Sequence, residues 1–186
     1  IEKADKVIAI SQNTKMDIID IFKVDESKIE VIYLGKSLIN DTLEKPNLFI
    51  PENYLLFVGN RSGYKNFERF IRSISEIIKK EKDLFVICAG GGSFNAYEKK
   101  LLQNLQIEKK ILQYNLEDKI LSYLYKNALM FIYPSLYEGF GIPILEAFSF
   151  GCPLICSNCS SFPEVAGDAA IYFDPNNEES IRESIK

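Results

Sequence analysis

Apolar residues along the chain occur in two patterns, short uninterrupted runs and stretches in which they recur every three or four positions. The runs predict buried strands, and the recurring pattern predicts amphipathic helices. The clearest helical stripe lies between residues 65 and 80 and consists of Phe67, Phe70, Ile71, Ile74, Ile77 and Ile78. We expect strands over 6–10, 29–34, 54–59, 84–92, 110–114, 128–135, 153–157 and 170–173. We expect helices over 12–23, 65–80, 94–106, 117–127, 142–150 and 177–186, the first of them capped by Ser11.

Strands and helices alternate along the whole chain, and the strands are mostly apolar. This combination predicts an α/β fold in which a parallel sheet is covered by helices on both faces. The stretch over 35–53 contains glycine, asparagine and proline, and it predicts a linker between a short first unit and a larger second one. Ligands of such sheets bind at the carboxyl ends of the strands. Glycines follow three of the predicted strands: Gly59, Gly90 to Gly92, and Gly139 with Gly141.

The composition is that of an ordinary globular protein, with 47% hydrophobic residues and a formal net charge of −4. The negative charge argues against a broad nucleic-acid-binding surface. No apolar run approaches the roughly 20 residues of a membrane-spanning helix, and the first residues do not resemble a signal peptide. The chain starts at Ile1 without a methionine and stops at Lys186 inside a segment that looks helical, so we interpret it as a fragment of a longer protein.

The sequence contains no histidine, which excludes a Ser-His-Asp triad, a Cys-His pair and a histidine-ligated metal built from this chain alone. Cys152, Cys156 and Cys159 are spaced closely enough to raise the question of a thiolate metal site. We favour a core role, because Cys152 and Cys156 flank an apolar run and free cysteine is common in protein cores. The low cysteine content and the missing export signal favour a reducing cytoplasm.

The segment EGFGIPILE, which begins at Glu138, carries the candidate chemistry. Gly139 and Gly141 allow a sharp turn and a close approach of a ligand to the backbone amides. Pro143 suits the first turn of a helix, so we expect Glu138 in a loop and Glu146 about one turn into that helix. Both carboxylates can then face one cleft at the positive end of the helix, where anions bind. Carboxylates that accept from hydroxyls, beside amides that donate to phosphates, suit a phosphorylated sugar.

Two other phosphate-binding motifs fail in this sequence. The tripeptide Gly35-Lys36-Ser37 resembles the end of a P-loop, but Glu30 stands where that motif requires glycine. The dinucleotide pattern Gly-x-Gly-x-x-Gly follows none of the predicted strands, and in the nearest match Ile144 replaces the third glycine. A dehydrogenase-type NAD-binding domain is therefore disfavoured.

Several stretches of the sequence resemble one enzyme family. They are PSLYEGFGIPILEAFSFGCPLICSN over 134–158, SSFPEVAGDAAIYFDP over 160–175, VGNRSGYKN over 58–66 and ADKVIAISQNTKMDII over 4–19. Together they resemble the family 4 (group 1) retaining glycosyltransferases, whose GT-B fold consists of two Rossmann-like domains. The resemblance implies that residues 1–45 are the tail of the acceptor-side domain together with a linker. It implies that residues 46–186 are the doubly wound, Rossmann-like donor-binding domain, truncated at its last helix.

The resemblance also implies roles for individual residues. Arg61 and Lys65 match a basic pair that holds the donor diphosphate, and Glu146 matches a residue that binds the ribose hydroxyls. Glu138 matches the residue that contacts the transferred sugar, and with Arg61 and Lys65 it forms the implied catalytic group. Tyr114 stands where the family usually has glycine, which leaves the identity of the base open. The implied donor-binding residues are Gly59, Arg61, Lys65, Tyr114, Leu116, Glu138, Gly139, Phe140, Gly141 and Glu146.

Some of these polar residues have a purely structural alternative. Taken alone, Arg61 and Lys65 read as ordinary solvated charges. Tyr133 and Tyr137 are expected to pack against neighbours rather than to bind a ligand. Glu164, in the segment SFPEVAG, is expected to cap or brace a loop.

The resemblance implies a cytoplasmic enzyme that transfers a sugar, with retention, from a nucleotide-diphosphate-sugar to a hydroxyl of a glycan or lipid-linked acceptor. It implies a role in cell-surface polysaccharide or glycolipid synthesis, without a metal or other cofactor. The missing domain would bind the acceptor and leaves peripheral membrane contact open, so we expect this chain alone to be inactive. Two alternatives remain: a non-catalytic nucleotide-sugar-binding module or half of a split enzyme, and another GT-B enzyme such as a sugar-nucleotide epimerase.

Overall fold

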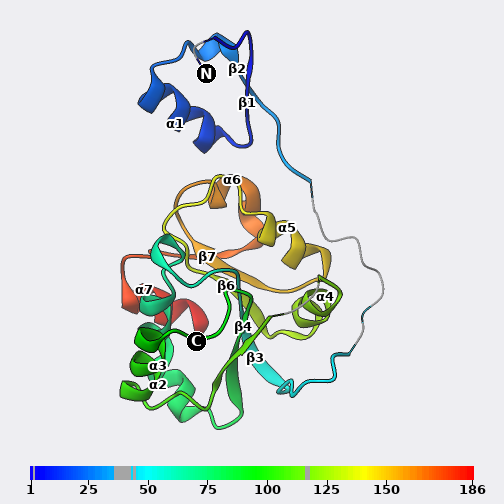
Figure 1. The fold of residues 1–186 in the computed structure, drawn as a ribbon, viewed down its shortest axis with the longest axis vertical. Helices are drawn as coiled ribbons and strands as arrows, with labels where there is room; N and C mark the ends of the chain where they lie inside the picture. The colour runs from blue at the N-terminus through cyan, green and yellow to red at the C-terminus, as the bar shows by residue number, and fades with distance from the viewer. Residues whose placement is uncertain (2, 36–42, 44, 116–117) are drawn as a thin grey trace.

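A short amino-terminal unit and a larger carboxyl-terminal unit make up the chain (Figure 1). The computed structural model describes residues 1, 3–35, 43, 45–115 and 118–186, except the side chains of residues 118 and 119. Within these residues the smaller unit contains a two-stranded parallel sheet, and the larger unit contains a six-stranded parallel sheet. The assignment of 1–45 and 46–186 to acceptor-side and donor-side domains stays a prediction.

The amino-terminal unit consists of two paired strands and the helix that connects them. Strand β1 (Val7–Ala9) pairs in parallel with β2 (Ile29–Val31), and α1 (Gln12–Phe22) lies between them in sequence, followed by a short 3₁₀ turn, η1 (Glu26–Lys28). Ser11 caps α1, because its side chain accepts a hydrogen bond from the amide of Thr14. The sequence prediction of a Ser11-capped helix after the first strand is confirmed.

The larger unit is built on strands whose order in the sheet is β5-β4-β3-β6-β7-β8, with each neighbouring pair parallel. The ends of these strands lie within two residues of the predicted ends. The exception is β4, for which the predicted strand also included the glycines at 90–92. The α/β fold with a parallel sheet is therefore confirmed. The strands are β3 (Asn53–Val58), β4 (Leu84–Ala89), β5 (Ile111–Tyr114), β6 (Met130–Tyr133), β7 (Leu154–Ser157) and β8 (Ile171–Phe173).

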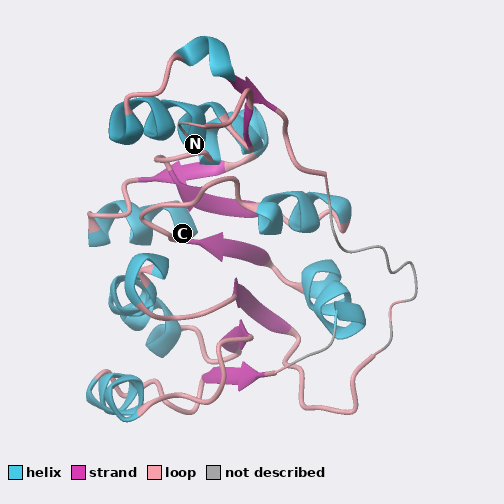
Figure 2. Ribbon diagram, turned by 45° about the horizontal axis from the view of Figure 1, so that its top comes forward, coloured by secondary structure: helices cyan, strands magenta, loops and turns pink. Residues whose placement is uncertain are grey.

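Helices cover both faces of this sheet (Figure 2). One face carries α2 (Phe67–Lys80), α3 (Ala96–Asn104) and α7 (Glu178–Ile185), and the other carries α4 (Asp118–Asn127), α5 (Ile142–Ser149) and α6 (Phe162–Ala166). The sequence analysis missed α6, because five residues are too few to show helical periodicity. It also missed the 3₁₀ turns η2 (Gly63–Lys65) and η3 (Gly167–Ala169). None of the helices in the described parts of the chain is long and apolar enough to cross a bilayer.

Alternating side chains of the strands fill two separate cores. On β3, Leu55 and Phe57 pack toward α2, while Tyr54 and Leu56 pack toward α4. Because both faces are covered, both sets are apolar, and the strand reads as one continuous hydrophobic run. This explains why uninterrupted apolar runs, rather than alternating ones, marked the strands in the sequence.

The strand order reverses next to β3, because β4 and β5 lie on one side of it and β6, β7 and β8 on the other. Such a reversal leaves a crevice at the carboxyl ends of the two strands where the order changes, here β3 and β6. The segment over 59–65 follows β3, and the segment over 134–138 follows β6. The topology therefore brings the two most informative sequence motifs to the same edge of the sheet.

Candidate functional site

The turn after β3 folds Lys65 back over the end of its own strand. Gly59 has a φ of 107° and donates its amide to Ala89 O at 2.8 Å, so the chain leaves the sheet in a conformation that favours glycine. A Cβ atom on Gly59 would lie 3.8 Å from Lys65 Nζ. The ammonium group is thus held close above the Gly59 turn.

Lys65 forms an ion pair with Glu138 across the switch point. Lys65 Nζ lies 2.7 Å from Glu138 Oε1, and both side chains are 14% exposed. Lys65 Nζ also lies 5.2 Å from the centre of the Tyr133 ring. Burial, followed by the negative charge of Glu138, raises the pKa of Tyr133, which keeps this residue a neutral phenol. The structure therefore brings together Gly59 and Lys65, which follow β3, and Glu138, which follows β6.

Glu146 lies in α5, one turn after the Glu138 loop, as the sequence predicts. The side chain is almost buried, and Tyr125 Oη of α4 donates to Glu146 Oε2 at 3.2 Å. Burial and then the charge of Glu146 raise the pKa of Tyr125. The charge of Glu146 also contributes to the raised pKa of Tyr133. Both carboxylates therefore raise the pKa of the same phenol, and the expectation that they face one cleft stays a prediction.

The two glycines of the Glu138 loop differ in backbone conformation. Gly141 has a φ of 97°, which favours glycine, and it immediately precedes α5. Gly139 has no such φ. A Cβ atom on Gly139 would make ordinary van der Waals contacts, at 3.4 Å from Ile10 Cδ1 and 3.6 Å from Thr14 Oγ1. The positive φ that favours glycine is thus found at Gly141 and not at Gly139.

Two backbone amides of this loop lack a protein partner in the part of the chain that the structure describes. Among the described residues, the backbone N–H groups of Phe140 and Gly141 have no hydrogen-bond acceptor. They directly precede α5, whose positive end adds to their attraction for negative charge. The ring of Phe140 is buried and lies 6.1 Å from the ring of Tyr33. Phe140 therefore packs with its side chain while its amide remains free to donate.

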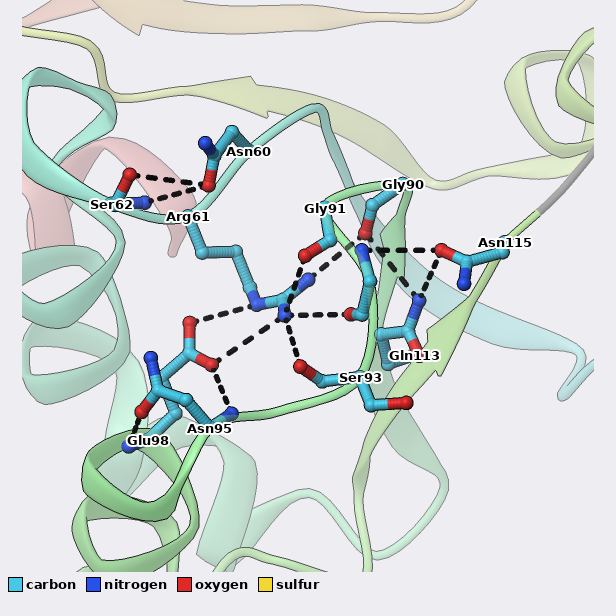
Figure 3. A network of polar contacts seen from close by, with 11 residues as sticks. Asn60, Arg61, Ser62, Gly90, Gly91, Ser93, Asn95, Glu98, Gln113 and Asn115 are labelled. Carbon is cyan, nitrogen blue, oxygen red and sulfur yellow. Dashed lines mark hydrogen bonds and ion pairs between the residues drawn. The ribbon is translucent and has the colours of Figure 1, made fainter.

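Arg61 reaches into a group of backbone carbonyl oxygens, with the Glu98 carboxylate beside them (Figure 3). Its side chain is only 2% exposed, and Nε donates to Glu98 Oε1 at 2.9 Å. Nη1 donates to Gly90 O at 2.9 Å and Nη2 to Gly92 O at 2.8 Å, with Gly91 O and Ser93 O at 3.3 Å. A Cβ atom on Gly91 would lie 2.9 Å from Nη1, so the loop must be glycine-rich to reach the guanidinium.

The implied pairing of Arg61 with Lys65 on a donor diphosphate stays a prediction, and the protein contacts of Arg61 bear on it. Most of the Arg61 donors are engaged by the glycine loop and by Glu98, which leaves little for a diphosphate. The sequence could not show this, because backbone carbonyls leave no residue signature and Glu98 is 37 positions away. Arg61 lines a cavity of about 490 Å³ between α2 and α3, and neither Lys65 nor Glu138 lines it.

Tyr114 turns its hydroxyl toward the linker. Its Oη donates to Phe49 O at 2.6 Å, and burial raises the pKa of the phenol. The residue stands at the carboxyl end of β5, two strands away from the switch point. Leu116, the other residue implied for the base pocket, lies outside the described residues.

The chain also matches a known protein family. The model of the family described as "Glycosyl transferases group 1" matches residues 40–186. The chain belongs to this family. The match confirms the resemblance found in the sequence.

Two bacterial mannosyltransferases are similar to this chain over nearly its whole length. It is 30% identical to O-antigen chain mannosyltransferase B of Escherichia coli over 97% of this chain and 50% of that protein. It is 31% identical to O-antigen chain mannosyltransferase RfbU of Salmonella typhimurium over 100% of this chain and 51% of that protein. The chain thus spans about half the length of the curated relatives it matches.

Solved structures share the fold of this group 1 chain. A glycosyltransferase from Rickettsia africae ESF-5 superposes with a TM-score of 0.80 at 25% identity, covering 97% of this chain and 52% of that one. A protein from Anabaena, crystallised in complex with UDP and glucose, gives a TM-score of 0.81 at 18% identity over 98% and 54%. At 18% identity, the Anabaena structure shows only that the fold is shared. The two structures together confirm the GT-B-type α/β architecture.

The structure also shows contacts of the implied site residues that the sequence does not predict. Four residues contact the implied site residues from other elements, and no spacing in the sequence links them to the site. They are Tyr125, Glu98, Ser11 and Thr14. Tyr133 packs against Phe162 as expected, with ring centres 4.7 Å apart. Tyr137 does not pack: it is 45% exposed, and its hydroxyl donates to Asp17.

The cysteines of this group 1 domain lie mainly in the core. Cys88, Cys152 and Cys156 are buried, and burial raises the pKa of each thiol to about 12. They are therefore protonated at neutral pH and are poor metal ligands in this form. Across the part of the chain that the structure describes, no group of three or more potential ligands gathers into a metal site.

Proposed function

We propose that this chain is the donor-binding part of a retaining glycosyltransferase. In the proposal it binds a nucleotide-diphosphate-sugar, and the complete protein transfers the sugar to a hydroxyl of a glycan or lipid-linked acceptor. The observation that carries this proposal is the contact between Lys65 and Glu138 at the switch point of a group 1 domain, followed in the chain by two loop amides without a protein acceptor among the described residues and by Glu146 in α5. The close contact between the Lys65 ammonium and the Glu138 carboxylate supports a binding site for a ligand that carries both phosphates and hydroxyls.

Each group in the cluster suits one part of such a donor. A diphosphate would replace Glu138 as the partner of Lys65 and would accept from the amide of Gly141, while the amide of Phe140 would donate to the transferred sugar. The released Glu138 carboxylate would accept from a sugar hydroxyl, and Glu146 would accept from the ribose. Positive charge beside the leaving diphosphate lowers the barrier to breaking the sugar–phosphate bond, because negative charge grows there during the reaction.

Two further parts of the proposal concern cofactors and setting. We propose that no metal is needed, since Lys65 and the positive end of α5 can offset the diphosphate charge. The names of the Escherichia coli and Salmonella relatives refer to O-antigen chains. They support a proposed role in cell-surface polysaccharide synthesis in the cytoplasm, with a mannose or another hexose donor.

A thermal-shift panel of UDP-, GDP- and ADP-sugars tests the proposal. A ligand at 100 times its dissociation constant stabilises the folded state by about 2.7 kcal/mol. For a domain of this size we expect the matching donor to raise the melting temperature by roughly 5–10 °C. The shift should persist in excess chelator. Absence of a shift with every donor at millimolar concentration would contradict donor binding, and a shift that needs a divalent metal would contradict the metal-free mechanism.

Changing Glu146 to alanine should weaken binding of the matching donor by about 1–3 kcal/mol, because the ribose hydroxyls lose their acceptor. The loss should be equal for the nucleotide-sugar and for the nucleoside diphosphate, since both carry the ribose. Isothermal titration calorimetry measures both, and Glu76→Ala provides an exposed carboxylate control. Unchanged affinity in Glu146→Ala would remove the ribose role from the proposal.

A further inference from the structure

The loop over 138–141 is held on its carbonyl side by hydroxyl groups from two different elements. Ser161 Oγ, at the start of α6, lies 2.8 Å from Phe140 O and 2.9 Å from Glu138 O. Ser160 also donates to Glu138 O. These contacts come from within the larger unit and fix the two ends of the loop.

The middle carbonyl of the loop is held by the amino-terminal unit instead. Ser11 Oγ donates to Gly139 O at 2.7 Å, and Thr14 Oγ1 donates to the same oxygen at 3.0 Å. Ser11 is completely buried. Both lone pairs of this carbonyl are thus satisfied by side chains that lie more than 120 positions earlier in the chain.

Holding a carbonyl also orients the neighbouring amide. The peptide bond is planar and trans, so the C=O of Gly139 and the N–H of Phe140 point in opposite directions. When Ser11 and Thr14 fix Gly139 O toward α1, the Phe140 N–H is fixed away from α1, toward the side of the loop that carries no protein acceptor. A carbonyl without these donors would be free to rotate with its whole peptide unit.

Helix α1 is itself anchored so that it can hold the loop. Glu164 of α6 accepts from the backbone amide of Gln12 at 2.6 Å and from that of Asn13 at 3.3 Å, which places a carboxylate on the first turn of α1. The expectation that Glu164 caps or braces a loop is confirmed, although it caps a helix start. Tyr137 adds a contact to Asp17, and that hydrogen bond raises the pKa of Tyr137 to about 12.

We infer that Ser11 and Thr14 are positioning residues for the donor: their hydroxyls fix the Gly139–Phe140 peptide so that the Phe140 amide faces the transferred sugar. The inference rests on the proposed function, because it assigns that amide to the donor. It makes donor affinity in the larger unit depend on how the amino-terminal unit is seated. Glu164 acts one step further back, since it holds the helix that carries the two hydroxyls.

The test compares Thr14→Val with Thr14→Ser in the full 186-residue chain. Valine keeps the shape of threonine but removes the donor to Gly139 O, whereas serine keeps the donor. We expect Thr14→Val to weaken the nucleotide-diphosphate-sugar about fivefold, the usual effect of one lost neutral hydrogen bond, and to leave the nucleoside diphosphate within twofold. Thr14→Ser should stay within twofold for both ligands. Asn177→Ala removes the cap of α7, which lies away from the loop in sequence, and serves as the control for a general loss of stability.

A second measurement needs no ligand. In protein labelled with ¹⁵N-phenylalanine, the amide signal of Phe140 should shift in Thr14→Val and move further in the double variant Ser11→Ala/Thr14→Val, but not in Thr14→Ser or Asn177→Ala. An unchanged Phe140 signal in the double variant would overturn the positioning role. Equal losses for the sugar-bearing and sugar-free ligands would overturn the assignment to the sugar. If the wild type binds no donor, the proposed function fails, and the Phe140 signal alone then decides the positioning role.

Discussion

Replacing Arg61 with methionine is expected to destabilise the chain by about 3–5 kcal/mol, because it leaves Glu98 as a nearly buried charge without its partner. The same change removes the donors to the carbonyls of Gly90 and Gly92. Buried carbonyls without donors add to the cost. For a domain of this size the melting temperature should fall by roughly 10 °C, which thermal and denaturant unfolding would both detect.

Arg72→Met is the matched control for Arg61→Met. Arg72 pairs with Glu68 on the surface of α2, and both side chains are 42% exposed, so its loss should change stability by less than about 0.5 kcal/mol. The double variant Arg61→Met/Glu98→Leu should recover part of the loss, since a buried pair replaced by apolar side chains leaves no lone charge. If Arg61→Met keeps its melting temperature but loses affinity for the nucleoside diphosphate, Arg61 binds phosphate and does not mainly stabilise the fold.

The sequence predicted the fold well because the fold depends on local pattern. The parallel strands are buried on both faces, so each appears as an apolar run, and the stripe from Phe67 to Ile78 marks α2. Ser11 was identified as a helix cap because capping acts over three residues. The helix α6 escaped because its five residues contain too little periodicity.

The site was predicted less completely, because its geometry depends on contacts between distant segments. The spacing of Glu138 and Glu146 correctly placed one in a loop and the other in α5. The direction of Arg61 is set by Glu98 and by backbone carbonyls, and the Gly139 carbonyl is held by Ser11 and Thr14. Neither constraint can be read from neighbours in the sequence. A family pattern transfers residue types to positions, but not the direction in which a side chain points.

Lys65 and Arg61 should therefore behave in opposite ways when mutated. Lys65 keeps 14% of its side chain exposed, against 2% for Arg61, so removing it should cost less stability. Its loss should instead fall on ligand binding, because Lys65 is the cation that directly contacts Glu138 beside the Gly59 turn. Comparing the Arg61 and Lys65 variants thus distinguishes a residue that stabilises the fold from a residue that binds the ligand.

Lys65→Met should weaken the nucleoside diphosphate by roughly 10- to 100-fold, as expected for a lost hydrogen bond to a charged group worth about 1.5–3 kcal/mol. The nucleoside without phosphates should bind as it does to the wild type, because the ribose and base contacts remain. Lys65→Arg should retain part of the affinity, since it keeps the charge but changes the geometry. Lys79→Met removes a surface lysine paired with Glu76 and should change nothing that calorimetry detects. If Lys65→Met binds the nucleoside diphosphate as tightly as Lys79→Met does, the diphosphate does not lie at the switch point, because no ligand there could avoid this ammonium group.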